Sequence, residues 1–76
     1  MQWFRVGLTG PIDKERFLQE LELNRIINGA PDTGVVFKGD TMEITVKSGE
    51  WNDESIRKTF QLLVHKVAPG VDVEWP

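Results

Sequence analysis

The chain has 76 residues, of which 39% are apolar and 28% charged, and its net charge is −3. A chain of this length forms one domain at most, with a thin core, so we expect a single domain over residues 1–76. It contains no cysteine, which excludes disulfides and thiolate-based metal or redox sites and fits a cytoplasmic location. The longest apolar runs are three residues, far shorter than a membrane span.

Basic residues are dispersed along the chain, and the longest basic run is Arg57-Lys58. Nucleic-acid-binding domains usually concentrate Lys and Arg on one face, because neutralising phosphates supplies much of their affinity. The composition therefore disfavours a nucleic acid as partner, and it offers no segment for a membrane. We expect the partner to be another protein or a second copy of the chain.

The first nine residues alternate in polarity and predict a half-buried strand, with Phe4, Val6 and Leu8 facing the core. The strand ends at Gly10-Pro11, because proline lacks the amide donor that a sheet ladder needs. Asp13 then has the short side-chain oxygen that caps a helix.

The first helix is predicted from Phe17, Leu18 and Leu21, which have the spacing of one helix face. Its end is harder to place, because the next apolar residues fall away from that face in a straight helix: Leu23, Ile26 and Ile27. We expect the helix to run to about Arg25, with Asn28-Gly29 as its stop signal. The alternatives are an end near Glu22 followed by an irregular or extended piece, or a broad buried apolar surface.

Residues 34–48 have the pattern of a β-hairpin. Gly39-Asp40 supplies the backbone angles that a tight turn requires. The second strand of the hairpin alternates apolar and polar residues and is the clearest strand in the chain, with three residues facing the core: Met42, Ile44 and Val46.

A second helix follows the hairpin. Asn52 is a good N-cap, and Asp53 and Glu54 place negative charge at the positive end of the helix dipole. One apolar stripe runs along it, formed by Ile56, Phe60, Leu63, Val64 and Val67. Pro69-Gly70 ends the helix, and residues 71–75 alternate in polarity as a last strand.

The element order is therefore β-α-β-β-α-β. Because each helix has a single apolar stripe, the economical α+β fold packs both helices on one face of a four-stranded antiparallel sheet. Right-handed crossovers then give a ferredoxin-like sandwich with the first and third strands central. This order also resembles that of RRM domains, although a shared fold does not assign a function.

The stretch Gly7-Leu8-Thr9-Gly10 has the G-x-x-G spacing of a phosphate-binding turn, so Gly7, Thr9 and Gly10 are candidate anion ligands. Backbone amides in a glycine-rich turn before a helix can bind phosphate. The P-loop and dinucleotide motifs need further residues that are missing, and the neighbouring charges are mixed. The alternative is that Gly7 permits close packing and that Gly10-Pro11 makes a turn.

The open face of the sheet, away from the helices, is the candidate partner-binding surface. We expect it to carry six residues: Trp3, Arg5, Glu43, Thr45, Asp72 and Glu74. Arg5 is expected between the two acids of the last strand and the third strand, in cross-strand contacts. If Trp3 is exposed, it is an interface anchor. Alternatively it folds over the sheet rim or lies under a terminus, and the charged pairs form only a solvated face.

The first alternative function is an RRM-like domain that binds RNA or another single-stranded nucleic acid. Such domains stack bases on aromatic side chains of their two central strands. Only Trp3 and Arg5 offer stacking surfaces here, and the third strand presents Glu43 at its centre. The second alternative is a phosphate- or small-ligand-binding domain that uses the turn from Gly7 to Gly10.

We expect no catalytic site, cofactor or metal. His65 is the only histidine and lies opposite the apolar stripe of its helix, with no orienting partner visible in the sequence. A metal site would need carboxylates to complete it, and the serines and threonines show no nucleophile motif. The sequence therefore predicts a small cytosolic, non-enzymatic accessory or inhibitor-like protein. It would bind a protein partner, or itself, through the open face or an edge strand.

Overall fold

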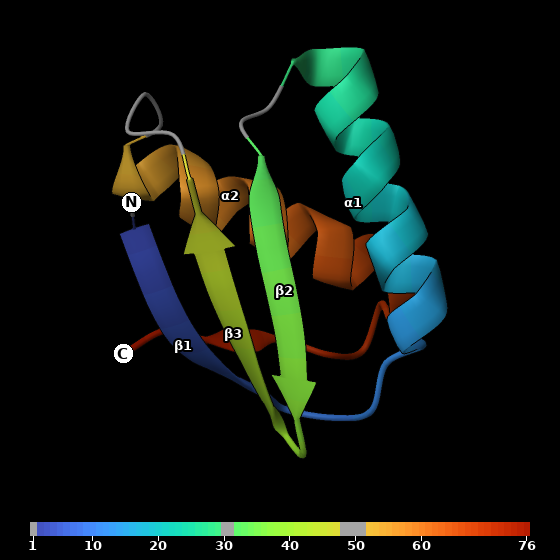
Figure 1. Ribbon diagram of the computed structural model, residues 1–76. Coiled ribbons are helices and arrows are strands. Elements are labelled where there is room, and N and C mark those ends of the chain that lie inside the picture. Colours follow the sequence, from blue (N-terminus) through green and yellow to red (C-terminus); the bar gives the residue numbers. More distant parts are fainter. Residues whose placement is uncertain (1, 30–31, 48–51) are drawn as a thin grey trace.

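The computed structural model describes residues 2–29, 32–47 and 52–76. The elements follow in the order β1 (Gln2–Leu8), α1 (Lys14–Asn28), β2 (Thr33–Lys38), β3 (Thr41–Val46), α2 (Asp53–Val67) and β4 (Val73–Glu74). The strands form one antiparallel sheet in the order β2-β3-β1-β4 (Figure 1). The predicted α+β class, the four-stranded antiparallel sheet and the central position of β1 and β3 are confirmed.

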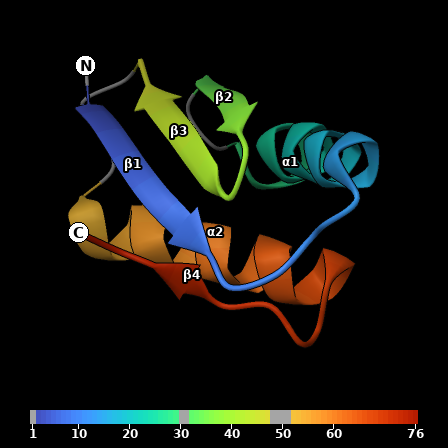
Figure 2. The same ribbon diagram turned by 90° about the horizontal axis from the view of Figure 1, so that it is seen from below.

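One face of the sheet is covered by α2, whereas α1, which was expected on the same face, lies at the edge of the sheet (Figures 1 and 2). α2 runs across the strands, and α1 lies beside the edge strand β2 (Figures 1 and 2). This leaves the opposite face of β1 and β3 without a covering helix. The strand order is compatible with the ferredoxin-like arrangement expected from the element order.

β2 and β3 form the predicted hairpin. Its turn has a positive φ of 58° at Gly39, and Asp40 keeps a negative φ, which is the pattern of a type II′ turn. The Thr41 hydroxyl donates a hydrogen bond to the Lys38 carbonyl oxygen (2.7 Å) across this turn. β3 buries every second residue, as its alternation predicted, namely Met42, Ile44 and Val46.

Asp13 caps α1 as predicted, because its Oδ1 accepts a hydrogen bond from the Arg16 amide (3.1 Å). The helix continues past Arg25, the expected end, and stops at Asn28. Gly29 then adopts a left-handed φ of 64°, a backbone conformation that residues other than glycine rarely take. The predicted stop signal, Asn28-Gly29, is thus confirmed, and the helix extends up to it rather than ending at Arg25.

α2 begins where the sequence predicted. The Asn52 side chain accepts a hydrogen bond from the Ser55 amide (2.8 Å), and Val67 is the last helical residue before Pro69-Gly70. β4 is shorter than expected, because only Val73 and Glu74 pair with β1.

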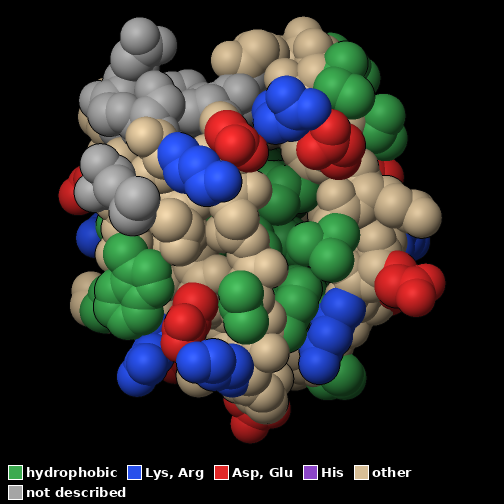
Figure 3. Space-filling model, viewed as in Figure 1, with side chains coloured by type: hydrophobic (Ala, Val, Ile, Leu, Met, Phe, Trp, Pro, Cys, Tyr) green, Lys and Arg blue, Asp and Glu red, His purple; other side chains and the backbone are tan. Residues whose placement is uncertain are grey.

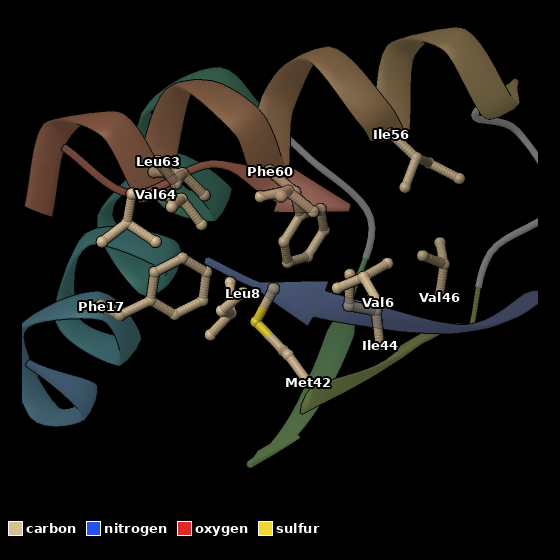
Figure 4. Packing of buried hydrophobic residues seen from close by; sticks show 12 residues of the cluster. Val6, Leu8, Phe17, Met42, Ile44, Val46, Ile56, Phe60, Leu63 and Val64 are labelled. Atoms are coloured by element: carbon tan, nitrogen blue, oxygen red, sulfur yellow. The ribbon is translucent and has the colours of Figure 1, made fainter. Parts of the chain in front are cut away.

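The core lies between the sheet and the two helices (Figure 4). Twelve buried hydrophobic residues form one cluster among the described residues: Val6, Leu8, Phe17, Met42, Ile44, Val46, Ile56, Phe60, Leu63, Val64, Val71 and Val73. α2 contributes four of them, whereas α1, which is described over its whole length, buries only Phe17. Leu18 was expected on the same face but is 43% exposed, because consecutive helix residues are about 100° apart. The Phe17 ring lies between those of Phe37 on β2 and Phe60 on α2, with centroids 5.8 Å and 6.2 Å away.

The second half of α1 differs from both alternatives drawn from the sequence. The chain stays helical beyond Glu22, yet its apolar residues are not buried: Leu23, Ile26 and Ile27 are 48%, 64% and 74% exposed. The positions that continue the face of Phe17 are held by Asn24 and Asn28, whose side chains hydrogen-bond each other (2.6 Å). The helical period therefore turns the apolar residues outward.

Candidate functional site

The open face of the sheet brings residues from three strands into cross-strand rows. Two rows contain most of the predicted partner-binding residues, and from β1 to β2 they read Trp3–Thr45–Gly34 and Arg5–Glu43–Val36. Figure 3 shows this face, with basic side chains on both sides of an acidic one toward the hairpin turn. The alternation of β1 and β3 produces this arrangement, because every residue that does not enter the core points to this face.

Glu43 is the electrostatic centre of the open face. Its carboxylate lies 3.1 Å from the Lys38 ammonium and 3.4 Å from the Arg5 guanidinium. Only 14% of the Glu43 side chain is exposed, although both cations are mostly exposed. The hydrogen bond from Lys38 is the main cause that lowers the pKa of Glu43. Partial desolvation opposes it, and the charges of Lys38 and Arg5 lower the pKa further.

Trp3 is 56% exposed on this face. The Arg5 guanidinium carbon lies 5.6 Å from the centroid of the Trp3 ring system, a cation–π distance. Arg5 therefore contacts Trp3 and Glu43 at once, which restricts the orientation of both the guanidinium and the indole. The result is an ordered aromatic surface next to a network of opposite charges.

The two acids near the C-terminal end lie elsewhere than predicted. Glu74 is the register partner of Gly7, and the Asp72 carbonyl accepts a hydrogen bond from the Thr9 amide (3.1 Å). Both acids therefore lie beside the later part of β1 and do not flank Arg5. The expectation was wrong because it assumed a register in which β4 extends further along β1. A sequence alternation fixes which face a residue takes but not its register partner.

His65 has a partner that the sequence did not reveal. Its Nε2 lies 2.8 Å from Asp72 Oδ1, because the turn after α2 reverses the chain and the Val71 amide donates to the Ala68 carbonyl (3.0 Å). The Asp72 amide donates to the Thr9 hydroxyl (2.8 Å). Asp72 thus contacts the imidazole through its carboxylate and Thr9 through its backbone amide, and the second bond holds the segment before β4 next to the end of β1. In a nucleophilic triad the imidazole would instead lie between the carboxylate and the hydroxyl. The Pro69-Gly70 turn was the one sequence signal for this contact.

Of the predicted anion ligands, Thr9 and Gly10 line a hollow of about 290 Å³ together with Lys14 and the hairpin turn, whereas Gly7 does not line it. The amide of Leu8 donates to the Asp40 carbonyl (2.8 Å), and that of Thr9 donates to the carbonyl of Asp72, the residue before β4 (3.1 Å). These two donors are therefore not free for an anion. A Cβ on Gly10 would lie 3.1 Å from Val71 Cγ2, so close packing accounts for that glycine. These contacts favour the interpretation of the stretch as a junction.

No family model, curated protein or solved structure matches this chain. In the part of the chain that the structure describes, no helix has the length and apolar character to cross a membrane. The same residues contain no group of three or more His, Asp or Glu side chains placed to hold a metal ion.

Replacing Glu43 with glutamine is expected to weaken the fold most at neutral pH. Because the pKa of Glu43 is lowered from its ordinary value of 4.5, its charged contacts stabilise the folded state above that pH. They are lost as the pH falls below 4.5 through the folded-state pKa. The difference in urea midpoint between the wild type and Glu43→Gln should therefore be larger at pH 7 than at pH 3. Glu74→Gln is the matched control on the same face, and a pH-independent difference for Glu43→Gln would contradict the assignment.

Proposed function

We propose that this protein is a small, non-enzymatic interaction module of the accessory or inhibitor type, built as a ferredoxin-like sandwich and acting in the cytoplasm. Its open sheet face binds a protein partner. The observation that carries this proposal is Trp3, a large aromatic side chain that is more than half exposed and held in place by Arg5.

The chemistry of the surface supports a protein partner. Tryptophan and arginine are the residues most enriched among interface positions that contribute strongly to binding. Around them, opposite charges meet at Glu43, and such charges specify orientation more than affinity. Val36 of the edge strand β2 adds an apolar contact in the same row as Glu43 and is 54% exposed. The partner would thus present an apolar pocket with polar groups around it.

The test starts from affinity capture with the purified chain in its native cell extract, followed by titration of the purified captured partner. Trp3→Ala is expected to weaken that binding by about 30-fold or more, the loss typical of an interface hot spot. Leu18→Ala is the control, because it removes a partly exposed apolar side chain from α1. Unchanged affinity in Trp3→Ala would refute the proposal. So would the absence of a protein partner together with salt-sensitive binding of labelled RNA pools.

A further inference from the structure

β1 has a neighbouring strand on both sides only near its C-terminal end. β3 pairs with it from Gln2 to Gly7, whereas β4 pairs with it at Gly7 and Leu8 alone. After β4 the chain diverges from β1 and lies at the level of α2 in Figure 2. On the side away from β3, no strand within residues 2–29, 32–47 and 52–76 therefore lies beside residues 2–6. We call this side of residues 2–6 the β1 edge.

The hydrogen bonds at the end of β1 determine which backbone groups point to the β1 edge. The Leu8 amide donates to the hairpin turn (2.8 Å), and the Thr9 amide donates to the residue before β4 (3.1 Å). Successive residues of a strand direct their N–H and C=O groups to opposite sides. Counted back from Thr9, the N–H and C=O groups of Trp3 and Arg5 point to the β1 edge.

Pro76 gives a physical reason why β4 does not cover these groups. In the register of β4, where Glu74 is opposite Gly7, Pro76 would be opposite Arg5. Proline has no N–H to donate to the Arg5 carbonyl, so the ladder cannot continue with a complete pair at this position. The backbone groups of Trp3 and Arg5 thus lie on an edge of the kind that pairs with an added strand.

Aromatic side chains flank the β1 edge on both faces of the sheet. Trp3 lies on the open face and is 56% exposed. On the side of α2, the Phe4 ring meets that of Trp75 edge to face at 6.0 Å, and the Arg57 guanidinium carbon lies 5.5 Å from the Trp75 ring centroid. The side chains of an added strand would therefore alternate between contacts with Trp3 and contacts with Trp75 and Arg57.

Charge distinguishes two positions of such a strand on the side of α2. Among the described residues, Arg57 takes part in no ion pair. Asp53, one turn earlier on α2, accepts a hydrogen bond from the Gln2 side chain (2.9 Å). An acidic side chain next to Phe4 would therefore meet the Arg57 cation, whereas one next to Gln2 would meet the Asp53 carboxylate.

We infer that the β1 edge binds an extended segment of the partner protein, which joins the sheet as a strand beside Trp3 and Arg5. The backbone of the segment pairs with these two residues, and its apolar side chains form one wall of the pocket for Trp3. On the side of α2 it places an aspartate or glutamate next to Arg57. This inference rests on the proposed function, because it states how the partner that contacts Trp3 is bound.

Hydrogen exchange of single amides, followed by NMR, tests the inference. The probe is a 12-residue peptide, selected on the immobilised full chain from a library of random linear peptides. In the free chain the amides of Trp3 and Arg5 should exchange faster than those of Phe4 and Val6, which pair with β3. At saturation the peptide should slow exchange at Trp3 and Arg5 by about 10-fold or more, and by more than at Phe4 and Val6.

Arg5→Pro and Arg5→Ala form a matched pair of variants. Both lose the Arg5 side chain, but only proline removes the N–H that points to the β1 edge. Because this N–H faces away from β3, both variants should fold, which urea denaturation checks. Arg5→Pro is expected to bind the labelled peptide at least about 10-fold more weakly than Arg5→Ala in fluorescence anisotropy. If Arg5→Pro does not fold, the exchange measurement on the wild type decides.

The contact with Arg57 has its own test. Replacing the acidic residue of the peptide by its amide should weaken binding to the wild type about threefold, as expected for an exposed ion pair. The same replacement should leave binding to Arg57→Gln unchanged. An equal loss in both proteins would contradict the assignment of the acid to Arg57.

Several results would overturn the strand addition. They are a library that yields no binding peptide, a bound peptide that leaves the Trp3 and Arg5 amides unprotected, and equal peptide affinities in Arg5→Pro and Arg5→Ala. Protection of these amides that rises with the concentration of the chain alone would assign the β1 edge to a second copy instead. The proposed function fails by a different result, namely unchanged affinity of Trp3→Ala for the captured protein. If that affinity falls but is equal in Arg5→Pro and Arg5→Ala, the proposed function stands and the strand addition is wrong.

Discussion

Replacing Phe17 with alanine is expected to lower the free energy of unfolding by about 3–5 kcal/mol. Phe17 is fully buried and is the only buried residue of α1. Its ring packs against those of Phe37 and Phe60, so alanine would leave a cavity between the sheet and both helices. A domain of this size has a total stability on the order of 4–11 kcal/mol, and the loss would therefore remove a large part of it.

Urea denaturation followed by tryptophan fluorescence and by far-ultraviolet circular dichroism measures this effect. If α1 detaches alone, the two probes will report separate transitions. Circular dichroism will detect the loss of α1, which contains half of the helical residues, whereas fluorescence will not, because no Trp lies on α1. Leu18→Ala is the matched control on the neighbouring position, which is 43% exposed, and we expect it to change stability by about 0.5 kcal/mol or less. Equal losses in the two variants would show that Phe17 does not attach α1 to the core.

Replacing Trp75 with alanine is expected to lower the free energy of unfolding by about 2–4 kcal/mol, because it removes a packed aromatic ring. The Trp75 ring meets that of Phe4 edge to face at 6.0 Å, and the Arg57 guanidinium carbon lies 5.5 Å from its centroid. These contacts hold the end of a chain whose last strand has only two paired residues. The variant should therefore also expose the backbone amides of β4 to faster hydrogen exchange.

The free energy of unfolding of Trp75→Phe should differ from that of the wild type by about 1 kcal/mol or less. The indole Nε1 is buried and has no hydrogen-bond partner among the described residues, and a buried donor without a partner costs about 1–3 kcal/mol. Phenylalanine keeps an aromatic ring against Phe4. It loses some buried apolar area, which is destabilising, but it also removes the unpaired N–H donor, which is stabilising. A Trp75→Phe variant as unstable as Trp75→Ala would instead show that the indole N–H is paired in the folded protein.

Local patterns predicted the elements and the open face. Alternation in β1 and β3 fixed which side chains enter the core, and it placed Trp3, Arg5 and Glu43 together on the opposite face. The capping residues Asp13 and Asn52 fixed where the helices begin. These signals act within a few residues of each other, so they can be read from the chain without knowledge of its tertiary structure.

Other features depend on contacts between distant residues. The sequence did not place β4 along β1, and for that reason it set Asp72 and Glu74 beside Arg5 and missed the contact of Asp72 with His65. Strand register depends on which apolar residues of two segments share the core and on the turns that join them. Neither can be determined from one strand alone.

The end of α1 shows the same division most clearly. The sequence by itself determined that Leu23, Ile26 and Ile27 leave the face of Phe17, because a helical period of 3.6 residues allows nothing else. Only the tertiary structure determined whether these three side chains are buried or exposed. α2 and the sheet fill the core, and within residues 2–29, 32–47 and 52–76 these three side chains lie exposed, as does Leu62 on α2. The helix itself continues to Asn28, between the Asp13 cap and the left-handed Gly29, with Phe17 packed in the core.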